Sequence, residues 1–255
     1  MIRFDRVSKR YPNGREALNG ASFEIVAGEM VYLTGRSGAG KSTILKLIAL
    51  LERPTRGIAV VNGRNTGTLP ARKIPAFRRE LGVVFQDHRL LTERNIFDNV
   101  ALPLYAAHMP LREIDKRVRA ALDQVGLLNR ATALPLELSV GEQQRVGIAR
   151  AVVGKPKLLI ADEPTGNLDP ELSADIIALF RRFNDVGVTV VIATHDIDIV
   201  RNSGLREIIV ADGRIHQDSG GRESASPQLL PVMRADIGAD PALRDDPGLR
   251  IEAKR

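Results

Sequence analysis

The residues with the clearest chemical potential form one octapeptide, Gly-Arg-Ser-Gly-Ala-Gly-Lys-Ser, at positions 35–42. Its G-x-x-x-x-G-K-S spacing, set between two short apolar runs, predicts a strand, a phosphate-binding loop and a helix. Glycines let the backbone approach a phosphate chain, and the positive end of the helix dipole adds to the attraction. Lys41 can reach the β- and γ-phosphates, and the Ser42 hydroxyl can ligate Mg²⁺. The octapeptide therefore predicts a nucleoside triphosphate site. Its candidate binding residues are Gly35, Arg36, Ser37, Gly38, Ala39, Gly40, Lys41, Ser42 and Thr43.

Two carboxylates follow the apolar run 158–161. At the end of a central parallel strand, Asp162 would lie beside the phosphate loop and hold Mg²⁺, largely through its water shell. Glu163 would orient or deprotonate the attacking water. A simple strand-ending turn, Asp-Glu-Pro, is the alternative reading of these residues, and the phosphate loop upstream argues against it.

Three further residues are candidates for the same site. His195 ends the next apolar run and can donate a hydrogen bond to the γ-phosphate. Gln86 follows another apolar run, where it can sense Mg²⁺ or the attacking water, and so counts as a catalytic and a metal candidate. Tyr11 precedes the loop at a distance that would bring its ring over a nucleobase. A purely structural role is the alternative for His195.

The elements that must position these residues follow from hydrophobic patterning. Residues 2–25 alternate and turn as an antiparallel β region does. Continuous apolar runs at 31–33, 81–85, 157–161 and 188–193, separated by helical segments, predict a parallel sheet buried on both faces. Between 86 and 150 apolar residues recur at helical spacing, as in the segment 111–125. We therefore expect an α/β fold with a mainly parallel sheet, an antiparallel β region and an inserted α-helical subdomain.

These patterns divide the chain into three parts. Residues 1–86 and 151–216 should form the nucleotide-binding core, and residues 87–150 the helical subdomain. Residues 217–255 should be a flexible tail, because prolines and glycines interrupt any long element there, with room for one short helix near 229–233. Six basic and six acidic side chains after position 220 make that tail neutral.

Composition limits the cellular context. The chain of 255 residues has a net charge of +6, but its Lys and Arg residues are scattered, so we expect no nucleic-acid partner. It contains no cysteine, which excludes disulfides and thiolate metal sites. The N-terminus lacks a signal-peptide pattern, and no apolar run approaches the roughly 18 residues that span a bilayer. A membrane role would therefore require a partner that holds the chain there.

A further segment, Leu-Ser-Val-Gly-Glu-Gln-Gln-Arg at 138–145, opens a helix with Ser139 as a natural N-cap. Together with the phosphate loop and the candidates above, it stands in the order and spacing of an ABC-type ATPase subunit, and from Ile2 to about Gly213 the chain resembles the cell-division members of that family. The resemblance is carried by the stretches 33–35, 85–88, 142–152, 161–169 and 188–196.

The resemblance implies a two-lobed P-loop NTPase that hydrolyses ATP with Mg²⁺. It implies a head-to-tail homodimer in the ATP-bound state, in which Ser139, Gly141 and Glu142 of one subunit meet the nucleotide of the other. The implied partners are an FtsX-like integral membrane subunit and other division proteins. That partner would hold the chain at the cytoplasmic face of the inner membrane, where the complex regulates cell-wall hydrolases.

The family segment normally reads Leu-Ser-Gly-Gly, and this chain has Val140 in place of the first glycine. A β-branched residue avoids positive φ, so Val140 would loosen the dimer if the backbone there required that conformation. Two alternatives to the division ATPase stay open. One is a nucleotide-gated scaffold with little hydrolysis, and the other is the ATPase subunit of a lipoprotein or drug exporter.

Overall fold

The computed structural model describes residues 1–166 and 168–220. The expected flexible tail and its short helix lie outside these residues, apart from the first four positions. Strand β10 (Arg214–Asp218) continues two residues past the tail boundary expected at 216. Regular structure therefore extends slightly further than the patterning of the sequence indicated.

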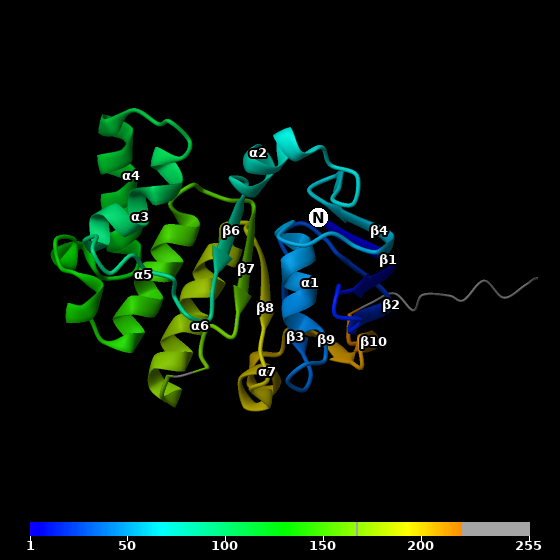
Figure 1. Ribbon diagram of the computed structural model, residues 1–255. Coiled ribbons are helices and arrows are strands. Elements are labelled where there is room, and N and C mark those ends of the chain that lie inside the picture. The colour runs from blue at the N-terminus through cyan, green and yellow to red at the C-terminus, as the bar shows by residue number, and fades with distance from the viewer. Residues whose placement is uncertain (167, 221–255) are drawn as a thin grey trace, which may run out of the picture. The chain divides into compact units, whose positions relative to one another are not determined.

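A six-stranded sheet forms the centre of the described region (Figure 1). Its strands run in the order β10-β9-β3-β8-β7-β6 and are parallel except for β10. The remaining members are β3 (Met30–Thr34), β6 (Leu81–Val84), β7 (Leu158–Asp162), β8 (Thr189–Ala193) and β9 (Arg206–Ala211). Each predicted apolar run is a strand of this sheet, so the predicted parallel core is confirmed.

Strand β3 shows why these runs are apolar throughout. Met30 and Tyr32 belong to one core cluster, while Val31 and Leu33 belong to the other. Alternate side chains of a strand point to opposite faces, so a sheet covered on both sides needs apolar residues at every position.

A second sheet, β2-β1-β4-β5, is antiparallel. It comprises β1 (Ile2–Arg10), β2 (Glu16–Ile25), β4 (Arg56–Val61) and β5 (Arg64–Asn65). Asn62 and Gly63 join β4 to β5 with positive φ at both positions, the geometry that favours an Asn-Gly hairpin turn. The expected antiparallel β region is therefore present and extends to residue 65.

The helices occupy the two sides of the central sheet. Figure 1 shows α3, α4 and α5 grouped on one side, and α1 with the antiparallel strands on the other. The helices are α1 (Lys41–Ile48), α2 (Ile74–Arg78), α3 (Ile96–Tyr105), α4 (Leu111–Gln124), α5 (Val140–Val152), α6 (Pro170–Asp185) and α7 (Ile197–Ser203), with short 3-10 turns at Ala71–Lys73, Leu128–Arg130 and Pro135–Glu137.

The helical insertion between β6 and β7 consists of α3, α4 and α5. In α4 the predicted apolar stripe is buried at Ile114, Val118 and Leu122, but Leu111 at its first position is exposed. Leu111 is the first residue of α4, and the buried positions of this helix begin one turn later, at Ile114. Among the helices of residues 1–220, none combines the length and apolar character that crossing a bilayer requires.

Strand register decides where the candidate site lies. Leu33 of β3 pairs with Ala193 of β8, and Ala193 pairs with Asp162 of β7. Because these strands are parallel, their carboxyl ends meet at one edge of the sheet. The loop at 35–40, the carboxylates at 162–163 and His195 all leave the sheet at that edge.

Candidate active site

The phosphate loop requires glycine at two positions for steric reasons. Gly35 has φ +138°, and a Cβ atom there would collide with the carbonyl oxygen of Val210. Gly40 has φ +120°, and its Cβ would lie 2.8 Å from the carbonyl oxygen of Ala17. Any side chain at either position would push the loop away from β2 and β9. The loop is therefore held close against both sheets, in line with the prediction from its glycines.

Lys41 begins α1 and turns back over this loop. Its side chain is 7% exposed, and Nζ donates to the carbonyl oxygen of Gly35 at 2.6 Å. Nζ also lies 3.7 Å from Oε1 of Glu163. A buried ammonium group supported by carbonyl oxygens and one carboxylate is a localised positive charge at the centre of the loop.

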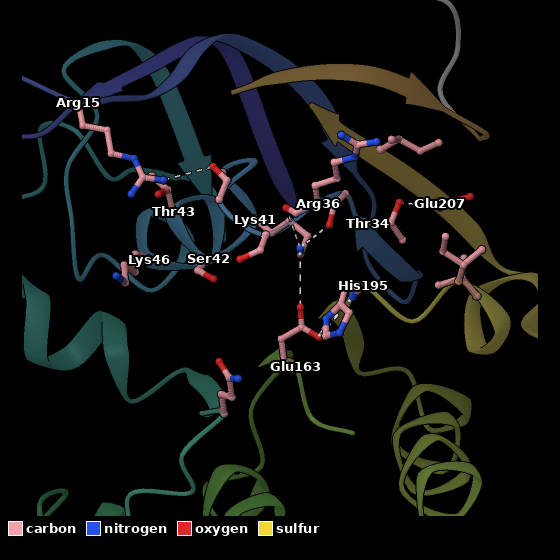
Figure 2. A pocket seen from close by; sticks show the side chains of 18 of the residues that line it. Arg15, Thr34, Arg36, Lys41, Ser42, Thr43, Lys46, Glu163, His195 and Glu207 are labelled. Atoms are coloured by element: carbon pink, nitrogen blue, oxygen red, sulfur yellow. Dashed lines mark hydrogen bonds and ion pairs between the residues drawn. The ribbon is translucent and has the colours of Figure 1, made fainter. Parts of the chain in front are cut away.

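Glu163 brings the carboxyl ends of two strands into contact (Figure 2). Its Oε2 lies 2.8 Å from Nδ1 of His195 and accepts from the His195 backbone N–H at 3.3 Å. Its own N–H donates to the carbonyl oxygen of Ala193 at 2.9 Å. Glu163 also has φ +48°, a left-handed conformation uncommon for glutamate. The backbone turn at this residue directs its carboxylate toward Lys41 and His195.

Ser42 and Asp162 form a second polar pair on the floor of the site. The Ser42 hydroxyl donates to Oδ1 of Asp162 at 3.1 Å. Burial raises the pKa of Asp162 above its ordinary value, while the Ser42 hydrogen bond and the charge of Lys41 oppose that rise. A half-buried carboxylate beside a hydroxyl is a favourable place for a hard cation.

These donors fit Mg²⁺ rather than a metal held by the protein alone. In the part of the chain that the structure describes, no three His, Cys, Asp or Glu side chains come together as a metal cage. Mg²⁺ is typically bound by one or two carboxylates and takes its remaining oxygens from phosphates and water. Asp162 and Ser42 supply the protein oxygens that such a site needs.

A pocket of about 1030 Å³ opens over the loop. Tyr11 and Gln86, both predicted from the sequence, contribute to its wall. The hydroxyl groups of Tyr11 and Thr43 lie 3.5 Å apart, and Nζ of Lys9 lies 5.1 Å from the centre of the Tyr11 ring. Predicted residues that line the pocket are Tyr11, Gly35, Arg36, Ser37, Gly38, Gly40, Lys41, Ser42, Thr43, Gln86, Glu163 and His195.

Five predicted residues do not line this pocket. Asp162 is one of them, although it accepts a hydrogen bond from the lining residue Ser42. Ala39 is buried beneath the loop, so its side chain supports the loop, and its backbone N–H donates to the carbonyl oxygen of Arg36. The other three, Ser139, Gly141 and Glu142, lie at the start of α5 in the helical subdomain. Because they were expected to meet the nucleotide of a second subunit, their absence from the pocket leaves that prediction open.

The start of α5 is nevertheless formed as predicted. The Ser139 hydroxyl accepts from the Glu142 N–H at 3.3 Å, and the Glu142 carboxylate accepts from the Ser139 N–H at 2.9 Å. This reciprocal pair is a capping box, which confirms Ser139 as the N-cap. Gly141 packs against Leu172 of α6, since a Cβ there would lie 3.1 Å from Leu172 Cδ1.

Val140 is the first residue of α5 and is half-exposed. It is not among the residues with positive φ. The conformation is therefore one that valine adopts readily, and the expected backbone conflict is absent. Only the bulk of its side chain remains as a difference from the glycine of the family segment.

Several pocket residues were not anticipated. Arg15 donates to the carbonyl oxygen of Gly38 at 3.3 Å, and the Thr34 hydroxyl donates to Glu207 at 2.6 Å. Lys46 could have been found, because it lies four residues after Ser42 on the same face of α1. Arg15 and Glu207 have no motif that marks them, since strand pairing alone brings them to the loop. The unanticipated lining residues are Asn13, Arg15, Thr34, Lys46, Ile197, Val200, Arg201, Glu207 and Ile209.

The phosphate loop lies at the carboxyl end of a parallel sheet, and a helical subdomain is inserted after β6. This arrangement defines a P-loop ATPase of the ABC type. The model of the family described as ABC transporter matches residues 18–166. The chain belongs to this family.

Individual relatives agree with this assignment. The chain is 54% identical over 220 residues to the "Cell division ATP-binding protein FtsE" of Escherichia coli K12, covering 86% of this chain and 99% of that protein. It is 46% identical over 226 residues to the protein of the same name from Bacillus subtilis, covering 89% and 99%. The solved "Dimeric Structure of MJ0796, a Bacterial ABC Transporter Cassette" has a TM-score of 0.79 at 36% identity and covers 86% of this chain and 97% of that one.

Proposed function

We propose that this chain is the ATP-hydrolysing subunit of a cell-division complex of the FtsE type. The central observation is the convergence of Lys41, Glu163 and His195 above the phosphate loop. These groups have the types and positions that phosphoryl transfer to water requires. The similarity to proteins named FtsE over almost their whole length supports the division role.

In this proposal the loop amides and Lys41 hold the phosphates of ATP. The Lys41 ammonium exchanges its contact with Glu163 for the γ-phosphate, because a doubly charged phosphate is the stronger partner. The Tyr11 ring, at the pocket wall, would cover the adenine base in this proposal. ATP binding would thus combine charged contacts to the phosphates with an aromatic contact to the base.

Glu163 then acts as the general base toward the attacking water. The Glu163 carboxylate only accepts hydrogen bonds, so the pairing with His195 places a proton on Nδ1 of the histidine. In this proposal His195 orients the carboxylate through Nδ1 and lines the pocket. Where Nε2 also carries a proton, it can donate a hydrogen bond to the γ-phosphate and stabilise its developing charge.

Mg²⁺ belongs to the same proposal. Ser42 and Asp162 would hold it, with Gln86 at the pocket wall as a further oxygen donor. The ion would supply charge neutralisation on the phosphate oxygens.

The partners proposed for this chain are a second copy and an FtsX-like membrane subunit. A solved dimer of a 36% identical cassette supports the first. The membrane subunit would hold the chain at the cytoplasmic face of the membrane. Support for it is indirect, because the names of the FtsE relatives give a role in cell division and no partner. Co-purification of the tagged full chain from membranes, followed by mass spectrometry, tests the partner. An FtsX-like protein is expected, whereas a lipoprotein or drug export subunit would overturn the division role.

Steady-state phosphate release from the purified chain with Mg²⁺ and ATP tests the reaction itself. We expect turnover that Glu163→Gln removes while binding of a fluorescent ATP analogue persists. Binding without any turnover, alone and in the purified complex, would instead favour a nucleotide-gated scaffold.

A further inference from the structure

The segment that follows Gln86 has an unusual backbone. His88 has φ +53° and Arg89 has φ +50°, so two consecutive residues other than glycine adopt the left-handed conformation. Such residues are uncommon singly, and they persist only where the surrounding structure holds them. The cause of this conformation must therefore be sought in what contacts the segment.

Arg150 provides that contact. It lies in the last turn of α5, and its Nη1 donates to the carbonyl oxygen of Arg89 at 2.6 Å, while its Nη2 donates to the carbonyl oxygen of His88. One planar guanidinium thus binds both carbonyls of the left-handed pair. A planar fork matches two adjacent carbonyl oxygens in a way that a lysine ammonium does not.

Both terminal nitrogens of Arg150 are directed at this contact. Within residues 1–166 and 168–220 no carboxylate lies within ion-pair distance of Arg150, although the charge of Asp87 acts on it from further away. Burial has the largest effect on the guanidinium and lowers its pKa. Asp87, the nearby acid, instead pairs with Arg89 at 3.1 Å. Partly burying a cation for two backbone carbonyls costs free energy, so this side chain contributes mainly to the shape of the segment.

A second anchor fixes the far end of the same segment. The fully buried amide of Asn99 in α3 accepts from the Leu91 N–H at 2.7 Å and donates to the Leu91 carbonyl at 3.0 Å. In addition, the Arg89 guanidinium lies 4.2 Å from the centre of the Phe85 ring, which closes the segment on itself. Both outside anchors come from the helical subdomain, although the segment begins at the end of β6.

We propose that Arg150 is a positioning residue that sets the place of Gln86 in the nucleotide pocket through the left-handed pair His88–Arg89. The inference rests on the proposed function. Ser139 caps the start of α5 and Arg150 lies near its end. One helix of 13 residues therefore connects residues 138–145, called here the signature segment, to the segment behind Gln86. A displacement of α5 that moves the signature segment must then also move Gln86.

The first test replaces Arg150 in the full chain. Arg150→Gln should lower kcat roughly tenfold, with the affinity for a fluorescent ATP analogue changed by less than about twofold. The kcat of Arg150→Lys should lie between those of the wild type and Arg150→Gln, because lysine can contact one carbonyl but not both. Arg145→Gln is the matched control, since it removes an arginine of the same helix that pairs with Asp175 on the surface.

The second test acts on the left-handed pair without touching Arg150. Glycine adopts this conformation freely and a β-branched residue resists it. His88→Gly should therefore keep wild-type turnover, while His88→Val should reproduce the loss of Arg150→Gln. The double variant His88→Val/Arg150→Gln should be no worse than either single variant, because both act at the same step. Hydrogen exchange over residues 85–91 should be faster in each impaired variant.

The outcomes separate this inference from the proposed function. A wild-type chain without ATPase activity in any preparation would overturn the proposed function. An active wild type with Arg150→Gln equal to Arg145→Gln, or with His88→Val fully active, would overturn the role of Arg150 alone. Loss of kcat and ATP affinity together with a lowered Tm would mean a merely structural role. If Arg150→Gln does not fold, Arg150→Lys and the two His88 variants still decide the matter.

Discussion

The Oε2 atom of Glu163 lies 2.8 Å from Nδ1 of His195, although the two residues are 32 positions apart. The other oxygen of the same carboxylate lies 3.7 Å from Nζ of Lys41. A single carboxylate therefore links the phosphate-binding lysine to the histidine at the end of β8. Under the proposed function, Glu163 would compete with phosphate for Lys41 and would also act as the base toward the attacking water.

Substitution of Glu163 by glutamine should separate these two roles. The amide keeps the size of the side chain but cannot take a proton, so turnover should fall by at least about a hundredfold. ATP affinity should stay equal or rise, because a negative charge beside the phosphates is removed. Phosphate release and titration with a fluorescent ATP analogue measure the two effects.

The same variant should accumulate as an ATP-bound dimer, which size-exclusion chromatography with and without ATP detects. A chain that stays monomeric in ATP and turns over at the wild-type rate would show that Glu163 is not the base.

Substitution of Lys41 by alanine should abolish nucleotide binding at micromolar ATP. Hydrogen bonds to charged groups contribute roughly 1.5–3 kcal/mol, which corresponds to about 10- to 150-fold in affinity. Lys116→Ala, on the exposed face of α4, serves as the control for loss of a positive charge. Near-normal affinity of Lys41→Ala for the fluorescent analogue would mean that phosphate is bound elsewhere.

Val140 allows a test of side-chain bulk against backbone freedom. Its φ is not positive, so the methyl groups and not the backbone should limit approach of a second subunit. We therefore expect Val140→Gly and Val140→Ala to raise ATPase activity of the assembled complex by similar factors, with unchanged ATP affinity of the single subunit. Steady-state turnover of both variants checks this.

Two results would contradict that expectation for Val140. An increase with glycine but not alanine would show that backbone freedom matters after all. No increase with either would mean that valine is simply tolerated at the start of α5.

Removal of residues 221–255 should leave the body intact. The buried apolar residues of the described region run from Ile2 to Val210. Thermal unfolding of the truncated chain should give a Tm within about 2 °C of the full chain, since stability follows buried apolar surface. A large fall in Tm would show that the tail docks on the body.

The amino-acid sequence by itself determined the parts of the site that are local. The phosphate loop, its flanking strand and helix, and the Ser139 cap each depend on residues within a few positions of one another. Glycine conformations, helix capping and side-chain periodicity are short-range properties, so their patterns can be read directly. The carboxylates at 162–163 could be placed at a strand end for the same reason.

Only the tertiary structure decided how separate segments meet. The contacts of Glu163 with His195, of Arg15 with Gly38 and of Arg150 with the His88–Arg89 pair join residues between 23 and 62 positions apart. Such contacts depend on strand register and helix packing, which the whole core fixes at once, and no local pattern encodes them.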